Sequence, residues 1–308
     1  MNTLRHTFRA MGTEVGLLAP AGTDPGAFHR AIVDTERTFA REELRFSRFR
    51  ADSELTRVNT SAGRWTHVSP GFAALTRFAL EAAWRSGGRF DPTVLPALVA
   101  AGYHSGFDEV LAGARDRLRP PAPCARFAEI ELENGHVRIP RGAGLDFGGV
   151  AKGWTADLAA ERAAEAGLPW AIVNAGGDLR IAGEPPVQGY EIGVEDPDDR
   201  SSEAVRLRLA TGALASSSTS VRSWGPGLHH LIDPRTGAPA ATGVVQATVW
   251  AETCAEAEVR SKWALLEGPA FLERMHAVLV MQDGRIVMNL DRPETLNPDR
   301  PETLQVSA

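Results

Sequence analysis

Apolar and polar residues alternate in several short segments of the chain, which is the pattern of half-buried β-strands. Residues 6–18 carry this pattern and predict a strand pair or one long strand. Asn134-Gly135 and Asp283-Gly284 each separate two short apolar runs, and such dipeptides favour tight hairpin turns. The other predicted strands are residues 171–173, 205–209 and 244–250.

Four longer segments have apolar residues at helical spacing. Asp24-Pro25 and Ser69-Pro70 each combine a capping side chain with a proline suited to the first helical position. The predicted helices are residues 25–44, 70–86, 150–166 and 254–266. Strands and helices are interspersed without a repeating strand–helix unit, which predicts an α+β fold with mixed or antiparallel sheets and packed helices.

The composition is that of a soluble globular protein, since 43% of the 308 residues are hydrophobic and 23% are charged. The net charge of −6 argues against nucleic-acid binding, which needs clustered positive charge. No apolar stretch approaches the roughly 18 residues of a membrane span, and no signal-peptide pattern is recognisable. We therefore expect no membrane anchor and a cytoplasmic location.

No low-complexity linker divides residues 1–290, which we expect to form one domain. The hexamer Asp-Arg-Pro-Glu-Thr-Leu occurs at residues 291–296 and again at 299–304. A repeated, charged segment that contains proline is typical of disorder. Residues 291–308 are therefore predicted to be a disordered C-terminal tail.

The chain has only two lysines, Lys152 and Lys262, among 33 basic residues. A coding bias toward arginine accounts for the general pattern, but a compact ammonium differs chemically from a planar guanidinium fork. Lys152 follows Asp146 and Gly148-Gly149 at the start of a predicted helix, which suits a phosphate-binding turn. An ordinary turn capped by Asp146 explains the same residues, and the pattern alone leaves both interpretations open.

Four other segments carry polar or reactive side chains. His229-His230 suits metal binding or proton transfer, although adjacent histidines are more often structural. Glu258 and Lys262 are four residues apart and are predicted to pair on one helix face, commonly as a surface salt bridge. Residues 174–178 are either a functional loop or a plain turn, and the hydroxyl-rich residues 216–220 are interpreted as a loop that binds phosphate or faces solvent. No segment matches the phosphate-binding loop of NTPases, the dinucleotide-binding glycine fingerprint or a zinc site.

Together these segments resemble the ApbE family of FAD:protein FMN transferases, from about Thr7 to Leu290. Each motif alone is weak, but seven occur in the family's order across nearly the whole chain. They are Met11-Gly12-Thr13, Phe46–Phe49 with Asp52–Asn59, Phe90–Val94, Asp146–Asp157, Asn174–Asp178, His230–Gly237 and Thr253–Gly268.

The resemblance implies an enzyme that transfers the FMN part of FAD to a threonine or serine hydroxyl of a target flavoprotein and releases AMP. FAD and a divalent metal, normally Mg²⁺, are the implied ligands. His230 matches the family's histidine and would assist deprotonation of the target hydroxyl. The FAD contacts implied by motif position are Met11, Phe49, Ala101, Gly102, Tyr103, Asp146, Lys152 and Ile232.

The implied metal ligands are a backbone carbonyl near Gly149 and two side chains of the last helix. Glu258 stands where the family has an aspartate, and it supplies a hard oxygen ligand. Lys262 stands in place of the family's threonine and cannot coordinate Mg²⁺ while protonated, which puts Mg²⁺ binding in question. Ser261 is the alternative hydroxyl ligand, or the Lys262 ammonium takes over the metal's electrostatic role.

Two other functions stay open at this stage. The first is a non-enzymatic protein that binds or delivers FAD and has a degenerate metal site, which Lys262 favours. The second is a metal-dependent FAD pyrophosphatase, in which water replaces the target hydroxyl. The residues Asp146, Lys152 and His230 suit the transferase and the pyrophosphatase equally.

Overall fold

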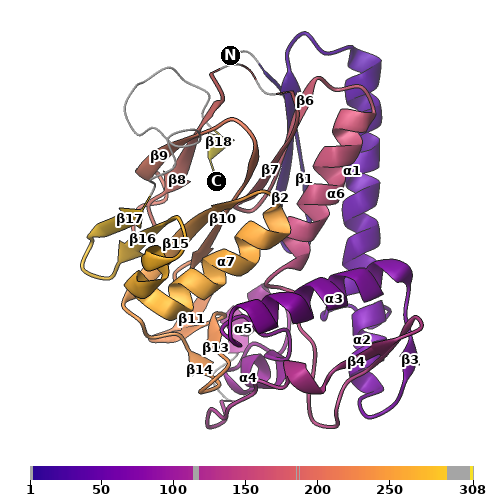
Figure 1. Ribbon diagram of the computed structural model, residues 1–308, viewed down its shortest axis with the longest axis vertical. Helices are drawn as coiled ribbons and strands as arrows, with labels where there is room; N and C mark the ends of the chain where they lie inside the picture. The colour runs from indigo at the N-terminus through magenta and orange to yellow at the C-terminus, as the bar shows by residue number, and fades with distance from the viewer. Residues whose placement is uncertain (1–2, 114–117, 185, 187, 290–305, 308) are drawn as a thin grey trace.

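The computed structural model describes residues 3–113, 118–184, 186, 188–289 and 306–307. Its largest element is an eight-stranded sheet in which every pair of neighbouring strands is antiparallel (Figure 1). The strands, in their order across the sheet, are β1 (Thr3–Ala10), β2 (Thr13–Pro20), β6 (Trp170–Ala175), β7 (Asp178–Gly183), β10 (Gly212–Ser218), β15 (Val244–Ala251), β16 (Ala277–Met281) and β17 (Ile286–Asn289).

Three long helices cover one face of this sheet (Figure 1). They are α1 (Pro25–Phe46), α6 (Ala151–Glu165) and α7 (Cys254–Glu267). Helix α1 begins where predicted, because the Asp24 side chain accepts a hydrogen bond from the Ala27 N–H and Pro25 occupies the first helical position. Alanine side chains dominate the contact between the helices and the sheet, so the helix backbones lie close to the strands.

The opposite face packs on β8 (Tyr190–Glu195) and β9 (Glu203–Leu209), which pair with each other. Strand β6 shows how the core is divided, because Ala171 and Val173 pack toward the helices while Trp170 and Ile172 pack toward β8 and β9. Strand β18 (Val306–Ser307) pairs with β8 in parallel.

A mostly helical region lies at one end of the sheet, at the bottom of Figure 1. Phe46 at the end of α1 and Phe72 of α3 both contact the ring of Phe147, which precedes α6, and these contacts join the helical region to the sheet. The elements of this region and the remaining short elements are α2 (Glu54–Thr60), β3 (Thr66–His67), α3 (Pro70–Arg85), α4 (Leu95–Ala100), α5 (Phe107–Gly113), η2 (Phe127–Glu129), β4 (Glu131–Glu133), β5 (His136–Arg138), β11 (Ser223–Gly225), β12 (Leu228–His229), β13 (Ile232–Asp233), β14 (Ala238–Pro239) and η3 (Gly268–Glu273).

The predicted α+β class is confirmed, as are the strand pair at the N-terminus, both hairpins and all four long helices. The interpretation of residues 216–220 as a loop is wrong for its first half, because Ser216–Ser218 complete strand β10. Leu290 and most of the predicted tail, residues 291–305 and 308, lie outside the described residues. Among the described residues, no helix combines the length and apolar character needed to cross a bilayer. The cytoplasmic location stays a prediction.

Candidate active site

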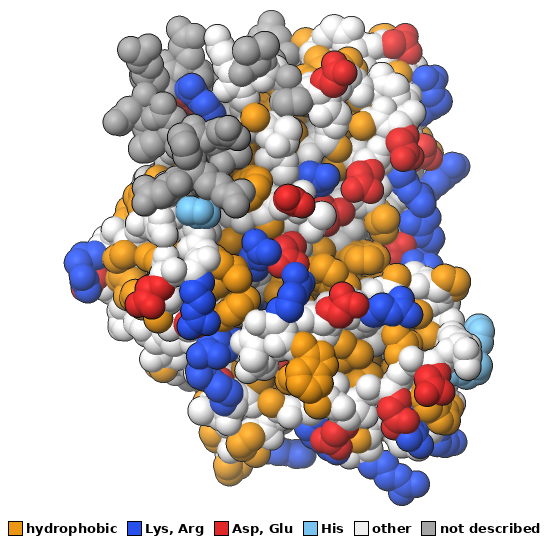
Figure 2. Space-filling view, in the orientation of Figure 1, with side chains coloured by type: hydrophobic (Ala, Val, Ile, Leu, Met, Phe, Trp, Pro, Cys, Tyr) orange, Lys and Arg blue, Asp and Glu red, His pale blue; other side chains and the backbone are white. Residues whose placement is uncertain are grey.

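A cavity of about 350 Å³ opens between the sheet and the helical region. A second hollow of about 510 Å³ adjoins it, and both are lined by Lys152, Arg222, His230 and Lys262. Figure 2, in the orientation of Figure 1, shows basic and acidic side chains next to apolar ones near the middle of the view. The site is therefore built in two parts that meet at a group of cationic side chains.

Helices α6 and α7 position the two lysines. Gly153 in the first turn of α6 lies against the backbone of Cys254 at the start of α7, where an added Cβ would come within 2.5 Å of the Cys254 carbonyl oxygen. Asp157, one turn further along α6, accepts hydrogen bonds from the N–H groups of Cys254 (2.7 Å) and Ala255 (2.9 Å). The two helix starts are thereby locked together, and each brings one lysine to the same place.

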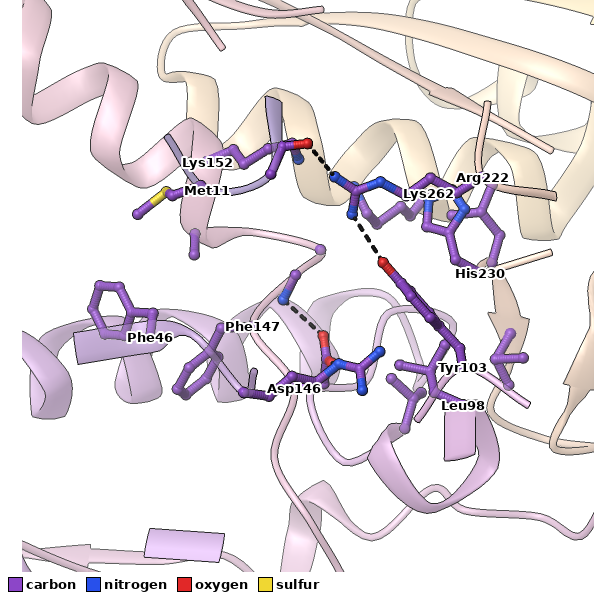
Figure 3. Close-up of a pocket in the computed structure, with 18 of the residues that line it drawn as sticks. Met11, Phe46, Leu98, Tyr103, Asp146, Phe147, Lys152, Arg222, His230 and Lys262 are labelled. Atoms are coloured by element: carbon purple, nitrogen blue, oxygen red, sulfur yellow. Dashed lines mark hydrogen bonds and ion pairs between the residues drawn. The ribbon is translucent and has the colours of Figure 1, made fainter. Parts of the chain in front are cut away.

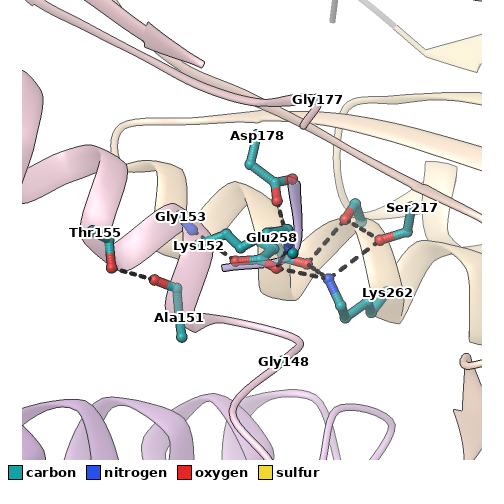
Figure 4. Close-up of polar contacts among 12 residues, drawn as sticks. Gly148, Ala151, Lys152, Gly153, Thr155, Gly177, Asp178, Ser217, Glu258 and Lys262 are labelled. Atoms are coloured by element: carbon teal, nitrogen blue, oxygen red, sulfur yellow. Dashed lines mark hydrogen bonds and ion pairs between the residues drawn. The ribbon is translucent and has the colours of Figure 1, made fainter. Parts of the chain in front are cut away.

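Both lysines bind buried carboxylates there (Figure 4). The Lys152 Nζ lies 2.7 Å from an oxygen of Asp178 and 2.5 Å from Glu258 Oε1. The Lys262 Nζ lies 3.3 Å from the same Glu258 oxygen. Glu258 is 0% exposed and Asp178 is 2% exposed, so the predicted Glu258–Lys262 pair exists but is not the surface salt bridge that its spacing suggested. We call Lys152, Asp178, Glu258 and Lys262 the charge cluster.

Burial and mutual charge shift the titration of this cluster. Burial raises the pKa of Glu258, but the ammonium groups of Lys152 and Lys262 outweigh that effect and leave the pKa below its usual value. Burial and the neighbouring Glu258 raise the pKa of Asp178 to about 6. Burial also lowers the pKa of Lys262, with the Lys152 charge acting in the same direction. Because the pKa of Asp178 is about 6, its carboxyl group is mostly ionised at neutral pH. The cluster then holds two negative carboxylates close to two lysine side chains.

The opposite wall of the cavity is aromatic (Figure 3). The rings of Phe49 and Tyr103 lie 5.8 Å apart, and the Arg48 guanidinium carbon lies 4.1 Å from the first ring centre and 4.4 Å from the second. Arg48 also pairs with Asp146 at 2.7 Å, and both side chains are nearly buried. The guanidinium lies against both rings, which also contact each other, and together they make a surface suited to a flat aromatic ligand. We call Phe49, Tyr103 and Arg48 the aromatic slot.

Met11 reaches the cavity from the β1–β2 hairpin. This hairpin has a two-residue turn, and Met11 and Gly12 both have positive φ angles, 51° and 70°. A non-glycine residue in this conformation is uncommon and is found where the surrounding structure holds it. The Met11 N–H donates to Glu43 Oε1 at 3.2 Å. The turn therefore presents a methionine at the cavity at some cost in backbone strain.

The two adjacent histidines have different environments. His229 is structural, because its ring bonds the Ala240 carbonyl oxygen (3.1 Å) and the Leu231 N–H (3.3 Å). His230 lines both parts of the cavity, and its buried Nδ1 has no hydrogen-bond partner within the described residues. Burial lowers the pKa of His230 well below its usual value, and the nearby Arg222 charge lowers it further. His230 is therefore neutral at pH 7 and able to accept a proton.

The structure brings most of the predicted FAD contacts to this cavity, but not all of them. Met11, Phe49, Tyr103, Asp146, Lys152 and Ile232 line it. Ala101 and Gly102 do not, because they lie behind Tyr103, where the Ala101 carbonyl oxygen accepts a hydrogen bond from Trp224 and the Gly102 carbonyl bonds the His104 ring. The backbone from Ala101 to Tyr103 thus positions the Tyr103 ring at the cavity, and Ala101 and Gly102 do not line it.

Three residues of the site were not among the predicted contacts. Arg48 falls inside a recognised motif, but its second ring contact is with Tyr103, which is 55 residues away in the sequence. Arg222 follows the hydroxyl-rich residues 216–220 in the sequence, and in the structure its Nη1 lies 3.5 Å from the Tyr103 hydroxyl. Asp178 ends the turn-like segment 174–178. An acidic residue directly after Gly176-Gly177 is the feature of the sequence that could have indicated it as a site residue.

The residues predicted to hold a divalent metal do not fit one in this arrangement. Both Glu258 oxygens are engaged, Oε1 by the two lysines and Oε2 by the Gly153 N–H at 2.8 Å. Ser261 lines neither cavity and bonds the Ser217 hydroxyl (2.7 Å) and the Glu258 carbonyl oxygen (2.9 Å). Within the described ranges, no group of three histidine, cysteine or acidic side chains is arranged to hold a metal ion.

The fold is of the α+β class, a sheet covered by helices with a charged and aromatic cavity at its end. The family model described as "ApbE family" matches residues 11–281, and the chain belongs to this family. Its relatives include proteins named FAD:protein FMN transferase. The one from Rhodobacter capsulatus is 32% identical over 207 residues, 65% of this chain and 39% of that protein. The one from Treponema pallidum is 28% identical over 253 residues, 75% of this chain and 69% of that protein. The chain thus spans well under half of the length of the first relative.

Solved structures show the same fold. The ApbE protein from Thermotoga maritima matches with a TM-score of 0.82 at 24% identity, over 93% of this chain and 97% of that one. The flavin transferase ApbE from Vibrio cholerae matches with a TM-score of 0.75 at 23% identity, over 94% and 96% of the two chains. The resemblance expected from the seven motifs is therefore confirmed for family and fold.

Proposed function

We propose that this protein transfers the FMN part of FAD to a threonine or serine hydroxyl of a target flavoprotein, with release of AMP. The observation that carries the proposal is the placement of His230. It lies where the two cavities meet, next to Lys152, Arg222 and Lys262. A diphosphate held by these cations would place a phosphorus atom near a neutral histidine, which is the arrangement that hydroxyl attack requires.

The two cavities divide the substrates between them. The aromatic slot suits a ring of FAD, and the cationic junction suits its diphosphate. The second cavity, lined by Ser216, Gly176 and Gly177 among others, leaves space on the other side of His230 for the acceptor segment. FAD would therefore enter from the slot and the acceptor from the opposite side.

The chemical step then has a simple balance. The acceptor oxygen forms a bond to the phosphorus of the FMN part, and the bond from that phosphorus to the AMP oxygen breaks. The acceptor proton passes to His230, and AMP leaves with the electron pair of the broken bond. Arg222, Lys152 and Lys262 stabilise the charge that develops on the phosphoryl oxygens, as fixed cations do in phosphoryl transfer.

Incubation of candidate flavoproteins with the protein and FAD, followed by mass spectrometry and AMP measurement, tests the proposal. We expect a covalent mass gain equal to FMN and an equal amount of AMP. The variant His230→Asn should still bind FAD but lose transfer by about 10²–10⁴-fold, the usual contribution of a positioned base. AMP without a covalent product would identify a pyrophosphatase, and FAD binding without AMP would identify a binding or delivery protein.

A further inference from the structure

We infer that Lys262 takes the place of a divalent cation in this protein, so that FAD is bound through side-chain cations alone and without a metal. The identity of the ligand rests on the proposed function, but the exclusion of the metal rests on the charge cluster itself. Three features of the structure carry the inference: the engaged oxygens of Glu258, the course of the Lys262 side chain, and the surplus of positive charge.

Both oxygens of Glu258 are already in contact with donors of this chain, and Oε1 is shared by two ammonium groups. Its Oε1 accepts from Lys152 at 2.5 Å and lies 3.3 Å from the Lys262 Nζ, and its Oε2 accepts from the Gly153 N–H at 2.8 Å. A metal at Oε1 would have to displace an ammonium from a carboxylate that is 0% exposed. A buried ammonium that loses its carboxylate is strongly disfavoured, so the lysines and a metal compete for the same oxygens.

The Lys262 side chain also fills the space beside the expected carbonyl ligand. A Cβ built on Gly149 would lie 3.0 Å from Lys262 Cε and 3.1 Å from Cδ, so the aliphatic part of the lysine lies directly against that glycine. Beyond it, the Lys262 Nζ lies 3.3 Å from the Glu258 backbone oxygen and 3.4 Å from the Ser217 hydroxyl. The ammonium therefore has oxygen neighbours on several sides, as a small cation would, and Figure 4 shows it pointing toward Glu258.

The charges of the site leave a surplus for an anion. Lys152, Lys262 and Arg222 contribute three positive charges, and Asp178 and Glu258 contribute two negative ones. The surplus faces the two cavities, which share all three cations as lining residues. Lys152 and Lys262 are the only lysines of the chain, and a compact ammonium matches the size of a metal position better than a guanidinium fork does.

Binding of Mn²⁺ to the full chain tests the exclusion directly. The signal of free aqueous Mn²⁺ in electron paramagnetic resonance would be measured with natural protein, Lys262→Thr and Arg260→Thr, each with and without FAD. Arg260 is the matched control, because it lies on the same helix α7 and its Nε bonds Glu256 at 2.7 Å, away from the cavity. We expect saturable binding to Lys262→Thr, in which Lys152 alone still competes for Glu258 Oε1, and none to the other two proteins.

Two outcomes of this titration would overturn the inference. Saturable binding to natural protein that disappears in Glu258→Gln would show that the metal coexists with Lys262. Absence of binding to all three proteins would show that Lys262 is not what excludes the metal. Thermal unfolding of each variant, recorded in parallel, confirms that the comparison is made between folded proteins.

FAD affinity tests the second half of the inference. Fluorescence titration of natural protein should give the same dissociation constant in EDTA and in excess Mg²⁺. Lys262→Met, which keeps the length and removes the charge, should bind FAD about tenfold more weakly in EDTA, the loss expected for one charge-assisted contact, while Arg260→Thr should bind normally. Loss of FAD binding to natural protein in EDTA, or unchanged binding to Lys262→Met, would overturn the inference.

The proposed function can fail separately. If natural protein bound no FAD under any condition, the transferase proposal would be wrong, while the Mn²⁺ titration without FAD would still decide whether Lys262 occupies a cation position. If FAD bound without metal but no covalent product formed, the metal-free site would stand and the transfer reaction would not.

Discussion

The two walls of the cavity are held in place by different forces. Three of the four residues of the charge cluster stand on α6 and α7, whose starts touch backbone to backbone at Gly153 and Cys254, and the fourth, Asp178, begins strand β7. The aromatic slot has no such contact between long helices: the Tyr103 N–H donates to the Leu98 carbonyl oxygen at 2.8 Å, and the other ring, Phe49, is 48% exposed. A change in a side chain can therefore alter the slot locally, whereas a change at the helix contact must move whole helices.

This difference suits the two tasks of the proposed reaction. Charges that stabilise a phosphoryl group are most effective when they are already in position and do not reorganise during the reaction. A surface that admits and releases a flat ring has to open, and the Phe49 ring, which is 48% exposed, is the least enclosed part of the slot. We call the charge cluster with α6 and α7 the rigid wall, and the aromatic slot the adaptable wall. The rigid wall thus carries the charges, and the adaptable wall carries the rings.

The largest expected effect breaks the rigid wall. Gly153→Ala places a methyl group 2.5 Å from the Cys254 carbonyl oxygen and 2.6 Å from its carbon, and neither backbone atom can move without shifting α7. We expect a loss of about 3 kcal/mol or more in the free energy of unfolding, measured with urea, because overpacking against backbone cannot relax cheaply. Gly22→Ala is the control, since an added Cβ there has no neighbour within 4 Å. Equal stability of the two variants would show that the contact between the helices is not rigid.

The sequence predicted the elements better than it predicted this contact. Asp24-Pro25 and Asn134-Gly135 act on their immediate neighbours, so local rules place helix α1 and the β4–β5 hairpin correctly. The run of serines at the end of strand β10 is typical of a solvated loop, which is why the sequence predicts a loop there. In the structure Ser217 is buried and hydrogen-bonded to Ser261. Hydroxyl pairing across 44 residues leaves no trace in a local pattern.

The same limit applies to the charge cluster. Lys152 and Glu258 are 106 residues apart, and no periodicity connects them. Motif positions taken from the family placed both near the ligand, but they could not show that Glu258 is fully engaged by two lysines. The burial of the Glu258–Lys262 pair was likewise hidden, since a spacing of four residues describes an exposed helix face and a buried one equally well.

The pH dependence of transfer tests His230, which lies where the two cavities meet. Burial and the Arg222 charge lower the pKa of His230 well below its usual value of 6.5, so the neutral base is already present at that pH. The transfer rate constant for bound FAD should therefore be level from pH 7 to pH 6.5. Protonation of His230 should reduce it about tenfold per pH unit only at distinctly lower pH, and a change centred near pH 6 would report Asp178 instead. An acid limb centred at 6.5 would mean that His230 is solvated when FAD is bound.

A smaller effect is expected from the aromatic slot. Arg48→Lys keeps the positive charge beside Asp146 but removes the planar group that lies 4.1 Å from the Phe49 ring centre and 4.4 Å from that of Tyr103. We expect the unfolding free energy to fall by about 1 kcal/mol, the order of one stacked cation, with a changed near-ultraviolet circular dichroism spectrum. A loss as large as that of Gly153→Ala would contradict the distinction between the walls.

The smallest effect concerns the turn that carries Met11, and the chain contains its own control. The β1–β2 and β4–β5 hairpins both have two-residue turns with positive φ angles, at Met11-Gly12 and at Asn134-Gly135. Asparagine tolerates this conformation and methionine does not, so the methionine is retained against the preference of the turn. Met11→Asn should raise the unfolding free energy by about 0.5–1 kcal/mol, and Asn134→Met should lower it by a similar amount. Met11 lines the cavity and Asn134 does not, so only Met11→Asn should weaken FAD binding. If both substitutions left FAD affinity unchanged, the strained turn would have no part in the site.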